Sequence, residues 1–570
     1  MNGPKAPKDP EQRRPYFYIM KDKEIFGSLQ EDGRGIQYLH QSDGRLINSA
    51  QIVGNIEDEN ILKLMETVDG FKKLVHSIGV SVETENPKEN VEFIFQMYGK
   101  KDIYGGGTNL TVTLTGDGAE KRIYLSEVNW KEDDNVPGQI KIMLDTPEKL
   151  ARTSVRLYLN DGYEAPENIE EQDVDLTSAS YQKMIQNSLI QCGNINRLGK
   201  AIARAKRGED ITVAYIGGSI TQGAGATPIN TECYAYKSFC LFRDMTGAKE
   251  NLHFVKAGVG GTPSELGMIR FDRDVRHGEQ DPDVVIVEFA VNDEGDETKG
   301  DCYESLVRKI LKLKSKPAVI LLFSVFADDY NLQKRLMPVG YQYDLPMVSV
   351  KNAVTPQFYD KDKRVVTKNQ FFYDMFHPSN LGHTIMADCL THLFMQVDAC
   401  LQDTGDLSLD MTYHLLAQDP AIGSTFENVR LLDRSTDGIA EIDCGAFSEK
   451  DELLQCVELD EDLHGTPEFP YNWMYQGTKE AVNPYFEMKI SCNALLLIFK
   501  DAGELSVGKA DVYVDGQKVL TADPHVNGWI HCNPVILFAE DTVKNHIVKI
   551  QMVEGDEDKF FTILGFGYVA

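Results

Sequence analysis

Ser219 lies in the stretch VAYIGGSITQG (213–223), where an apolar run ends in two glycines followed by a serine. A serine at such a position often caps the helix that follows, because its side-chain oxygen accepts a hydrogen bond from a helix N–H group. The same turn can instead expose the serine as a nucleophile, which requires a base to remove the hydroxyl proton. His377 is a candidate base, because imidazole exchanges protons near neutral pH. Asp374, three residues earlier, is the type of group that orients such a histidine.

Two further segments carry groups that are suited to binding a ligand. The turn KAGVGGTPSELG (256–267) contains Gly260 and Gly261, and glycines let backbone N–H groups approach a ligand closely. The segment EFAVNDEGD (288–296) places Asn292 at the end of another apolar run. Each of these segments also has an ordinary explanation as a turn or a helix cap. All four segments nevertheless fall in one region of the chain, at expected strand ends or loops, which favours a shared site.

The central region alternates between helical and strand patterns. Its helical patterns include a long amphipathic run at 179–207 and the segment 303–316. The strand candidates are 211–217, 252–258, 283–291 and 318–326. Continuous apolar strands separated by helices predict a parallel sheet that is covered on both faces. Because ligands bind such sheets at the carboxyl ends of the strands, Ser219 and Asn292 are expected at the binding edge.

The flanking regions consist mostly of short strand-like runs broken by turn residues. These runs are 91–99, 109–118 and 122–130 on one side and 493–501, 509–520, 546–553 and 560–569 on the other. A helical pattern at 59–79 interrupts the first set, the acidic segment 164–175 is expected to be a linker, and VDGQ (514–517) is expected to form a hairpin turn. We therefore predict three domains: a β-rich accessory domain at 1–177, a catalytic domain at 178–402 and a β-sandwich at 403–570.

The composition is typical of a globular protein that is too long for one hydrophobic core. The 570 residues are 42% hydrophobic and 26% charged, with a net charge of -30 that disfavours nucleic acid and anionic membranes as partners. The polar N-terminus has no apolar signal region, so we expect a cytoplasmic protein. Its ten cysteines form no CxxC pair and are expected to be reduced. Neither a metal site nor a cofactor is predicted, and nothing in the sequence indicates an oligomeric state.

In their order along the chain, the four segments resemble the conserved blocks of the SGNH (GDSL-type) hydrolase family. Ser219 in IGGSIT matches the block I serine, and Gly261 in GVGGT matches the block II glycine, with Gly260 as the second choice. Asn292 in AVND matches block III, while DMFH matches the DxxH of block V through Asp374 and His377. The chain departs from the family at the aspartate of GDS and the glycine of GxND, although every reactive group is present. The GxSxG elbow of ordinary α/β-hydrolases is absent, since Thr221 replaces its second glycine.

The resemblance implies a three-layer α/β/α, flavodoxin-like catalytic domain between two β-rich domains of the β-sandwich or jelly-roll type. It implies Ser219 as the nucleophile, His377 as the general base and Asp374 as its partner. It also implies an oxyanion hole formed by the N–H groups of Ser219 and Gly261 and the side-chain amide of Asn292. With its flanking domains, the chain is similar to multi-domain bacterial carbohydrate acetylesterases.

The expected activity is hydrolysis of O-acetyl esters on oligosaccharides from plant polysaccharides, such as acetylated xylan or mannan fragments, by a serine esterase. An esterase or lysophospholipase for lipid-like or small aryl esters is one alternative. A carbohydrate-binding protein with a vestigial hydrolase core is another, although the intact serine, asparagine, aspartate and histidine argue against it. Trp473 and Trp529 are expected either to fill the sandwich core or to stack on sugar rings.

Three nearby polar residues are expected to have structural roles. His383 is interpreted as a histidine on the face of a helix. Asp293 and Glu294 are interpreted as members of a solvated loop rather than as groups that attract a cationic substrate.

Overall fold

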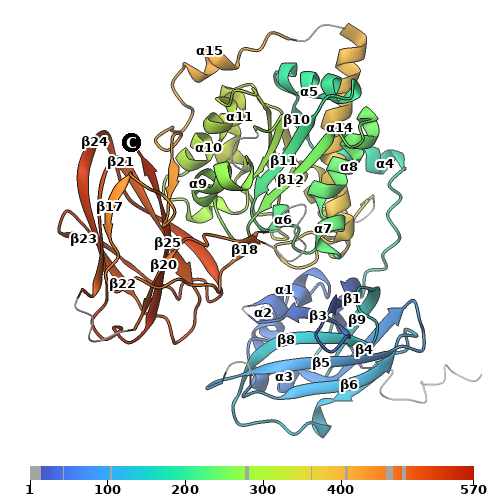
Figure 1. The fold of residues 1–570 in the computed structure, drawn as a ribbon. Coiled ribbons are helices and arrows are strands. Elements are labelled where there is room, and N and C mark those ends of the chain that lie inside the picture. Colours follow the sequence, from blue (N-terminus) through green and yellow to red (C-terminus); the bar gives the residue numbers. More distant parts are fainter. Residues whose placement is uncertain are drawn as a thin grey trace, which may run out of the picture.

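A computed structural model describes residues 14–42, 44–102, 105–276, 281–360, 363–404, 408–457, 466–477 and 483–570. An α/β unit lies at the top of the view, with an N-terminal β-rich unit (blue) below it and a C-terminal β-rich unit (orange to red) beside it (Figure 1). The interpretation of residues 1–13 as a polar terminus lies outside the described residues. The architecture agrees with the predicted fold class, an α/β domain flanked by two β-rich ones.

The central sheet has six strands in the order β10-β15-β14-β13-β11-β12. Their bounds are Leu189–Gln191 for β10, Met347–Ser349 for β15, Ala318–Phe323 for β14, Val284–Glu288 for β13, Ile211–Gly217 for β11 and Leu252–Gly258 for β12. All neighbours pair in parallel except β10 and β15. Gly217 at the end of β11 is in register with Gly258 of β12 and Glu288 of β13. The segments that follow these three strands therefore meet at one edge of the sheet.

Helices cover both faces of the central sheet. Alternate residues of β11 face opposite sides, so Val213 and Tyr215 belong to one hydrophobic cluster and Ala214 and Ile216 to the other. The first cluster includes residues of helices α4 (Ala179–Gln186), α5 (Asn196–Lys206), α8 (Tyr234–Thr246), α12 (Val350–Tyr359) and α14 (Asn380–Thr404). The second includes residues of α9 (Ser264–Asp274), α10 (Asp301–Leu311) and α11 (Gln333–Gln342). The predicted three-layer arrangement is confirmed.

The predicted single helix at 179–207 is wrong. The chain forms α4, the edge strand β10 and then α5. Gly193 adopts φ +55, where an added Cβ would lie 2.4 Å from the Asp344 carbonyl oxygen, so the chain turns closely against its neighbour there. Ser188 accepts a hydrogen bond from the Ser349 N–H at the end of β15. Pairing with the sheet edge has overridden the helical periodicity.

The N-terminal unit packs two antiparallel sheets around one hydrophobic cluster. One sheet contains β1 (Tyr16–Phe26), β9 (Leu150–Leu159), β4 (Val75–Thr84) and β7 (Lys121–Tyr124), in this order. The other contains β2 (Ser28–Leu29), β3 (Gly35–His40), β8 (Asp134–Leu144), β5 (Asn90–Gly99) and β6 (Asn109–Thr115). Helix α1 (Arg45–Ile52) also contributes to the cluster.

The helical pattern predicted at 59–79 is confirmed only as far as Leu74. The segment contains α2 (Glu59–Leu64), α3 (Val68–Leu74) and the first residues of β4. Thr67 starts α3 by accepting a hydrogen bond from the Gly70 N–H. From Val75 the chain pairs with β9 instead of continuing the helix.

The C-terminal unit is built on the long antiparallel strands β21 (Tyr485–Asp501), β24 (His531–Met552) and β25 (Phe560–Val569). The VDGQ hairpin is confirmed: β22 (Ala510–Val514) pairs with β23 (Gln517–Ala522), and the turn residues Asp515 and Gly516 have φ 52 and 79. Strand β21 packs Leu496 and Ile498 into the cluster shared with α9, and Leu495 and Leu497 into the sandwich interior. One face of the sandwich is thus continuous with the core of the α/β unit.

The described part of the chain contains no helix that is both long enough and apolar enough to cross a membrane.

Candidate active site

Ser219 is the first residue of the short helix α6 (Ser219–Gln222), directly after β11. The two preceding glycines are required by close packing. An added Cβ at Gly217 would lie 2.5 Å from the Glu288 carbonyl oxygen, and one at Gly218 would lie 2.3 Å from the Asn292 side-chain oxygen. The glycine pair therefore lets the chain turn against the neighbouring strand and brings Ser219 beside Asn292.

Ser219, His377 and Asp374 form a continuous series of hydrogen bonds. His377 Nε2 lies 2.9 Å from Ser219 Oγ, and His377 Nδ1 lies 2.9 Å from both carboxylate oxygens of Asp374. A carboxylate only accepts, so Nδ1 carries the proton and Nε2 is free to accept from the serine hydroxyl. This is the arrangement in which a histidine can act as a general base.

The carboxylate of Asp374 is held in its ionised form. Burial alone would raise its pKa, but the attraction and hydrogen bond of His377 and the N–H of Phe376 outweigh burial and hold the pKa well below its usual range. The N–H groups of Phe376 and His377 both donate to Asp374 Oδ1 at 2.8 Å. The turn that carries both residues thus fixes the carboxylate as well as the imidazole.

Three backbone N–H groups at or near Ser219 have no acceptor within the described protein. Among the described residues, the N–H groups of Ser219, Gly260 and Gly261 donate to no protein acceptor. Gly261 has φ +69, and an added Cβ there would lie 2.9 Å from the Trp529 ring, so glycine is required. An added Cβ at Gly260 would lie 3.9 Å from Ser219 Cβ. The glycine turn and Asn292 together surround the serine with groups of the type that stabilises an oxyanion.

A cleft of about 1010 Å³ opens above Ser219 and is lined by all three units. The α/β unit contributes Ser219, Gly260, Gly261, Asn292 and His377 at its base, with Phe326 and Phe376 beside them. The N-terminal unit contributes residues that include Arg45 and Tyr98, and the C-terminal unit contributes the loop His525–Trp529. Four of the five residues predicted for the site, and Gly260, therefore border one cavity, and the fifth, Asp374, is joined to it through its hydrogen bond with His377.

The two candidate sugar-stacking tryptophans lie in different places. Trp473 is 3% exposed and packs against Phe486 and Phe566 inside the sandwich. Trp529 is 46% exposed and lines the cleft, and its ring packs edge to face against His531 with the ring centroids 4.8 Å apart. Of the pair, only Trp529 is placed to meet a ligand.

Three structural interpretations have different outcomes. Asp293 is not part of a solvated loop: it is fully buried, and the N–H and hydroxyl of Ser264 donate to its carboxylate at 2.8 Å each. Burial raises its pKa to about 7. Glu294 is exposed, as expected, and accepts a hydrogen bond from Tyr330. His383 is buried between the Tyr234 N–H and the Ala224 carbonyl, and burial lowers its pKa to about 3, which supports a structural role.

The cleft residues of the N-terminal unit are absent from the sequence prediction. Arg45 and Tyr98 lie more than a hundred residues before Ser219, Tyr98 in the predicted strand 91–99 and Arg45 in a segment for which no element was predicted. No local signal distinguishes them, because their position depends on how the units pack. Within the described ranges, no three His, Cys, Asp or Glu side chains gather as metal ligands would.

Residues 215–385 match the model of the GDSL-like Lipase/Acylhydrolase family. No curated protein matches the chain significantly. Among solved structures, the chain is similar to a two-domain esterase (CEX) active on acetylated mannans, co-crystallized with mannopentaose. That structure is 24% identical with a TM-score of 0.56, and the match covers 67% of this chain and 98% of that one. A second structure of a two-domain esterase (CEX) active on acetylated mannans is 24% identical with a TM-score of 0.54, and the match covers 68% of this chain and 99% of that one. At this level of identity, the similarity establishes the fold.

Proposed function

We propose, from the premise that residues 215–385 form a GDSL-like hydrolase domain, that the chain is a serine esterase that removes O-acetyl groups from oligosaccharides derived from plant polysaccharides. The observation that carries the proposal is the series of hydrogen bonds from Asp374 through His377 to Ser219. Ser219, at the end of this series, lies at the base of a large cleft.

In the proposed reaction, Ser219 Oγ attacks the acetyl carbonyl carbon while His377 Nε2 takes the hydroxyl proton. The carbonyl oxygen becomes an oxyanion, which accepts hydrogen bonds from Ser219 N–H, the glycine turn and the Asn292 amide. When the C–O bond to the sugar breaks, the imidazolium returns the proton to the leaving alkoxide. A water molecule, deprotonated by His377, then attacks the acetyl-serine and releases acetate and free Ser219. Asp374 stabilises the imidazolium in both halves of the cycle.

The shape of the cleft supports a saccharide as the leaving group. A cavity of about 1010 Å³ is much larger than an acetyl group requires, and the exposed ring of Trp529 presents an apolar face beside the glycine turn. The solved structures with a similar fold are of an esterase active on acetylated mannans. Both observations favour acetylated oligosaccharides over simple esters.

The proposal is tested by measuring acetate released from acetylated manno- and xylo-oligosaccharides by the wild-type protein and by Ser219→Ala. We expect release by the wild type alone, with acetyl esters preferred over butyryl and longer esters. A preference for octanoyl esters would favour the lipid-esterase alternative. Binding of these saccharides without any acetate release would favour a binding protein.

A further inference from the structure

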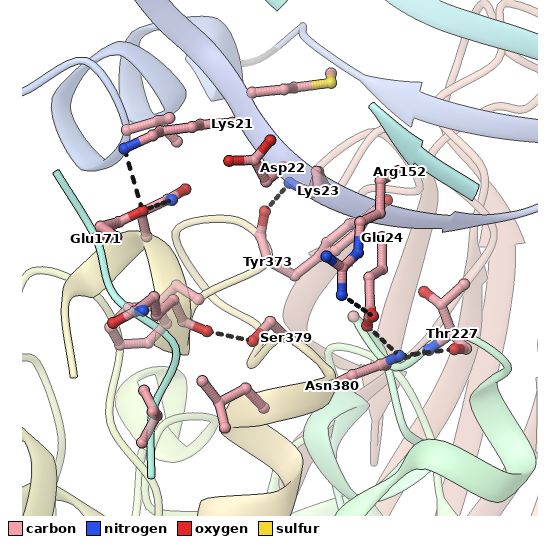
Figure 2. A pocket seen from close by; sticks show the side chains of 18 of the residues that line it. Lys21, Asp22, Lys23, Glu24, Arg152, Glu171, Thr227, Tyr373, Ser379 and Asn380 are labelled. Atoms are coloured by element: carbon pink, nitrogen blue, oxygen red, sulfur yellow. Dashed lines mark hydrogen bonds and ion pairs between the residues drawn. The ribbon is translucent and has the colours of Figure 1, made fainter. Parts of the chain in front are cut away.

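Strand β1 of the N-terminal unit lies beside Tyr373 and Asn380 (Figure 2). These two residues flank Asp374 and His377 in the sequence. The ammonium group of Lys23, on this strand, donates a hydrogen bond to the carbonyl oxygen of Tyr373. It also lies 3.9 Å from the centroid of the Tyr373 ring. A cation over an aromatic face is attracted to it, so Tyr373 is held through both its backbone and its side chain. Tyr373 is the residue directly before Asp374.

Tyr373 also closes the turn that carries Asp374 and His377, residues 373–377, which we call the catalytic turn. Its N–H donates to the carbonyl oxygen of His377 at 2.8 Å, and Phe372 forms an isolated β-bridge with Pro378. The Tyr373 side chain packs against the hydrophobic cluster of the N-terminal unit. The peptide at the start of the turn is therefore fixed from the outside by Lys23 and from the inside by the residue that supplies the imidazole.

Glu24, the next residue of β1, fixes the far end of the same loop. Its Oε2 accepts a hydrogen bond from Asn380 Nδ2 at 2.8 Å. Asn380 also accepts from the Thr227 N–H at 2.7 Å and donates to the Thr227 carbonyl at 2.8 Å. Thr227 follows α6, the helix that begins at Ser219, by a few residues. Figure 2 shows Glu24, Asn380 and Thr227 joined in one series.

The charge of Lys23 also acts on the catalytic carboxylate. Burial lowers the pKa of Lys23 to about 8, and the negative charge of Asp374 opposes this change. Below that pH the side chain is a cation, and its charge contributes to the low pKa of Asp374. Mechanical support of the turn and electrostatic support of Asp374 thus come from one side chain of another unit.

We propose that Lys23 and Glu24 are positioning residues for the catalytic turn, so that the N-terminal unit is a working part of the active site and not an independent module. This inference rests on the proposed esterase function. Neither residue borders the cleft above Ser219, so both act through Tyr373 and Asn380. Their loss should slow the chemical step more than it weakens substrate binding.

Lys21 offers a matched control on the same strand. Its ammonium group donates to the Ile169 carbonyl at 2.6 Å and lies 3.6 Å from a Glu171 carboxylate oxygen, on the acidic segment that joins the units. It therefore contributes to docking of the N-terminal unit without contacting Tyr373 or Asn380. If docking alone mattered, Lys21 and Lys23 would behave alike.

The test measures kcat and KM for p-nitrophenyl acetate in the wild type, Lys23→Met, Lys23→Arg, Glu24→Ala and Lys21→Met. We expect Lys23→Met and Glu24→Ala to lower kcat by ~10-fold or more, because a small misplacement of a catalytic group is costly, with KM changed by less than about twofold. Lys23→Arg, which keeps the cation and the donors, should recover most of the loss, and Lys21→Met should stay within about twofold of wild type.

Thermal unfolding shows which variants are folded, and Glu24→Ala tests the same turn independently if Lys23→Met does not fold. Unchanged kcat in the folded variants, or an equal loss in Lys21→Met, would overturn the inference while leaving the proposed function intact. A wild-type protein that hydrolyses no ester would instead contradict the proposed function, and this inference with it.

Discussion

At the level of single residues, Ser219, His377 and Asp374 form one hydrogen-bonded series. Because they act together, removing Ser219 or His377 alone should cost about as much activity as removing the whole series. Ser219→Ala and His377→Ala are each expected to abolish measurable turnover of p-nitrophenyl acetate while the protein remains folded. Asp374→Asn should retain more activity, because this residue orients and stabilises the imidazole without bonding to the substrate. Steady-state kinetics with a circular-dichroism check of folding measures both effects. Wild-type turnover in purified Ser219→Ala would rule out the assignment.

Asn292 should act on the transition state rather than on bound substrate. Its side-chain oxygen is buried without a hydrogen-bond partner, and the residue lies against Gly218 at the edge of the cleft. Asn292→Ala is expected to lower kcat by ~10²–10³ with little change in KM, because the amide would bond charge that develops only during the reaction. An effect confined to KM would make Asn292 a substrate-binding residue instead.

The residues of the catalytic turn could be predicted because their types and short spacing are visible in the sequence. The choice between Trp473 and Trp529 could not, since both follow turn residues in strand-rich segments. What separates them is whether the side chain packs against Phe486 inside the sandwich or beside Gly261 in the cleft. The role of Lys23 could not be predicted from the sequence either, because its contact with Tyr373 joins residues 350 positions apart in the chain.

At the level of helices and strands, β13 and β14 were predicted well because each is a continuous apolar run buried on both faces. The helical patterns at 179–207 and 59–79 were confirmed only in part, because periodicity alone does not reveal where a chain leaves a helix to pair with a strand. Leu189 and Val75 are the residues at which these segments begin to pair with a neighbouring strand.

Helix α9 carries a buried carboxyl group that should make stability depend on pH. Burial, reinforced by Asp296 and Asp293, raises the pKa of Glu265 from 4.5 to about 9. Between these values the folded state keeps a proton that the unfolded state has lost, so stability decreases as pH rises through this range. The free energy of unfolding in urea should therefore decrease from pH 5 to pH 8 by about 1 kcal/mol or more beyond the decrease in Glu265→Gln. Equal slopes in the two proteins would contradict the raised pKa.

At the level of the whole molecule, the α/β unit and the C-terminal sandwich share a hydrophobic core that includes Leu266 and Leu496. At this junction Arg270 donates to the Gly217 carbonyl, and Arg273 pairs with the buried Glu468 of the sandwich. The sandwich is therefore fixed to α9, whose Arg270 holds the end of β11, and its His531 donates to the Gly261 carbonyl beside the cleft.

Trp529→Ala should consequently change substrate selection. We expect kcat/KM for acetylated oligosaccharides to decrease about tenfold, which corresponds to the ~1–2 kcal/mol of a lost aromatic contact. Hydrolysis of p-nitrophenyl acetate should change little, since that small substrate does not extend to the ring. Trp473→Ala serves as the comparison, because it removes a buried core side chain and should lower the unfolding temperature instead. Equal losses on both substrates in Trp529→Ala would indicate a disturbed glycine turn rather than a sugar platform.

Covalent labelling with a fluorophosphonate, followed by peptide mass spectrometry, tests most directly whether Ser219 is an activated nucleophile. We expect one adduct, on the peptide that contains Ser219. It should be lost in Ser219→Ala and form much more slowly in His377→Ala, because there the hydroxyl proton has no acceptor. An adduct on a different residue, or ester hydrolysis that continues while Ser219 stays unlabelled at saturating probe, would contradict this role of Ser219.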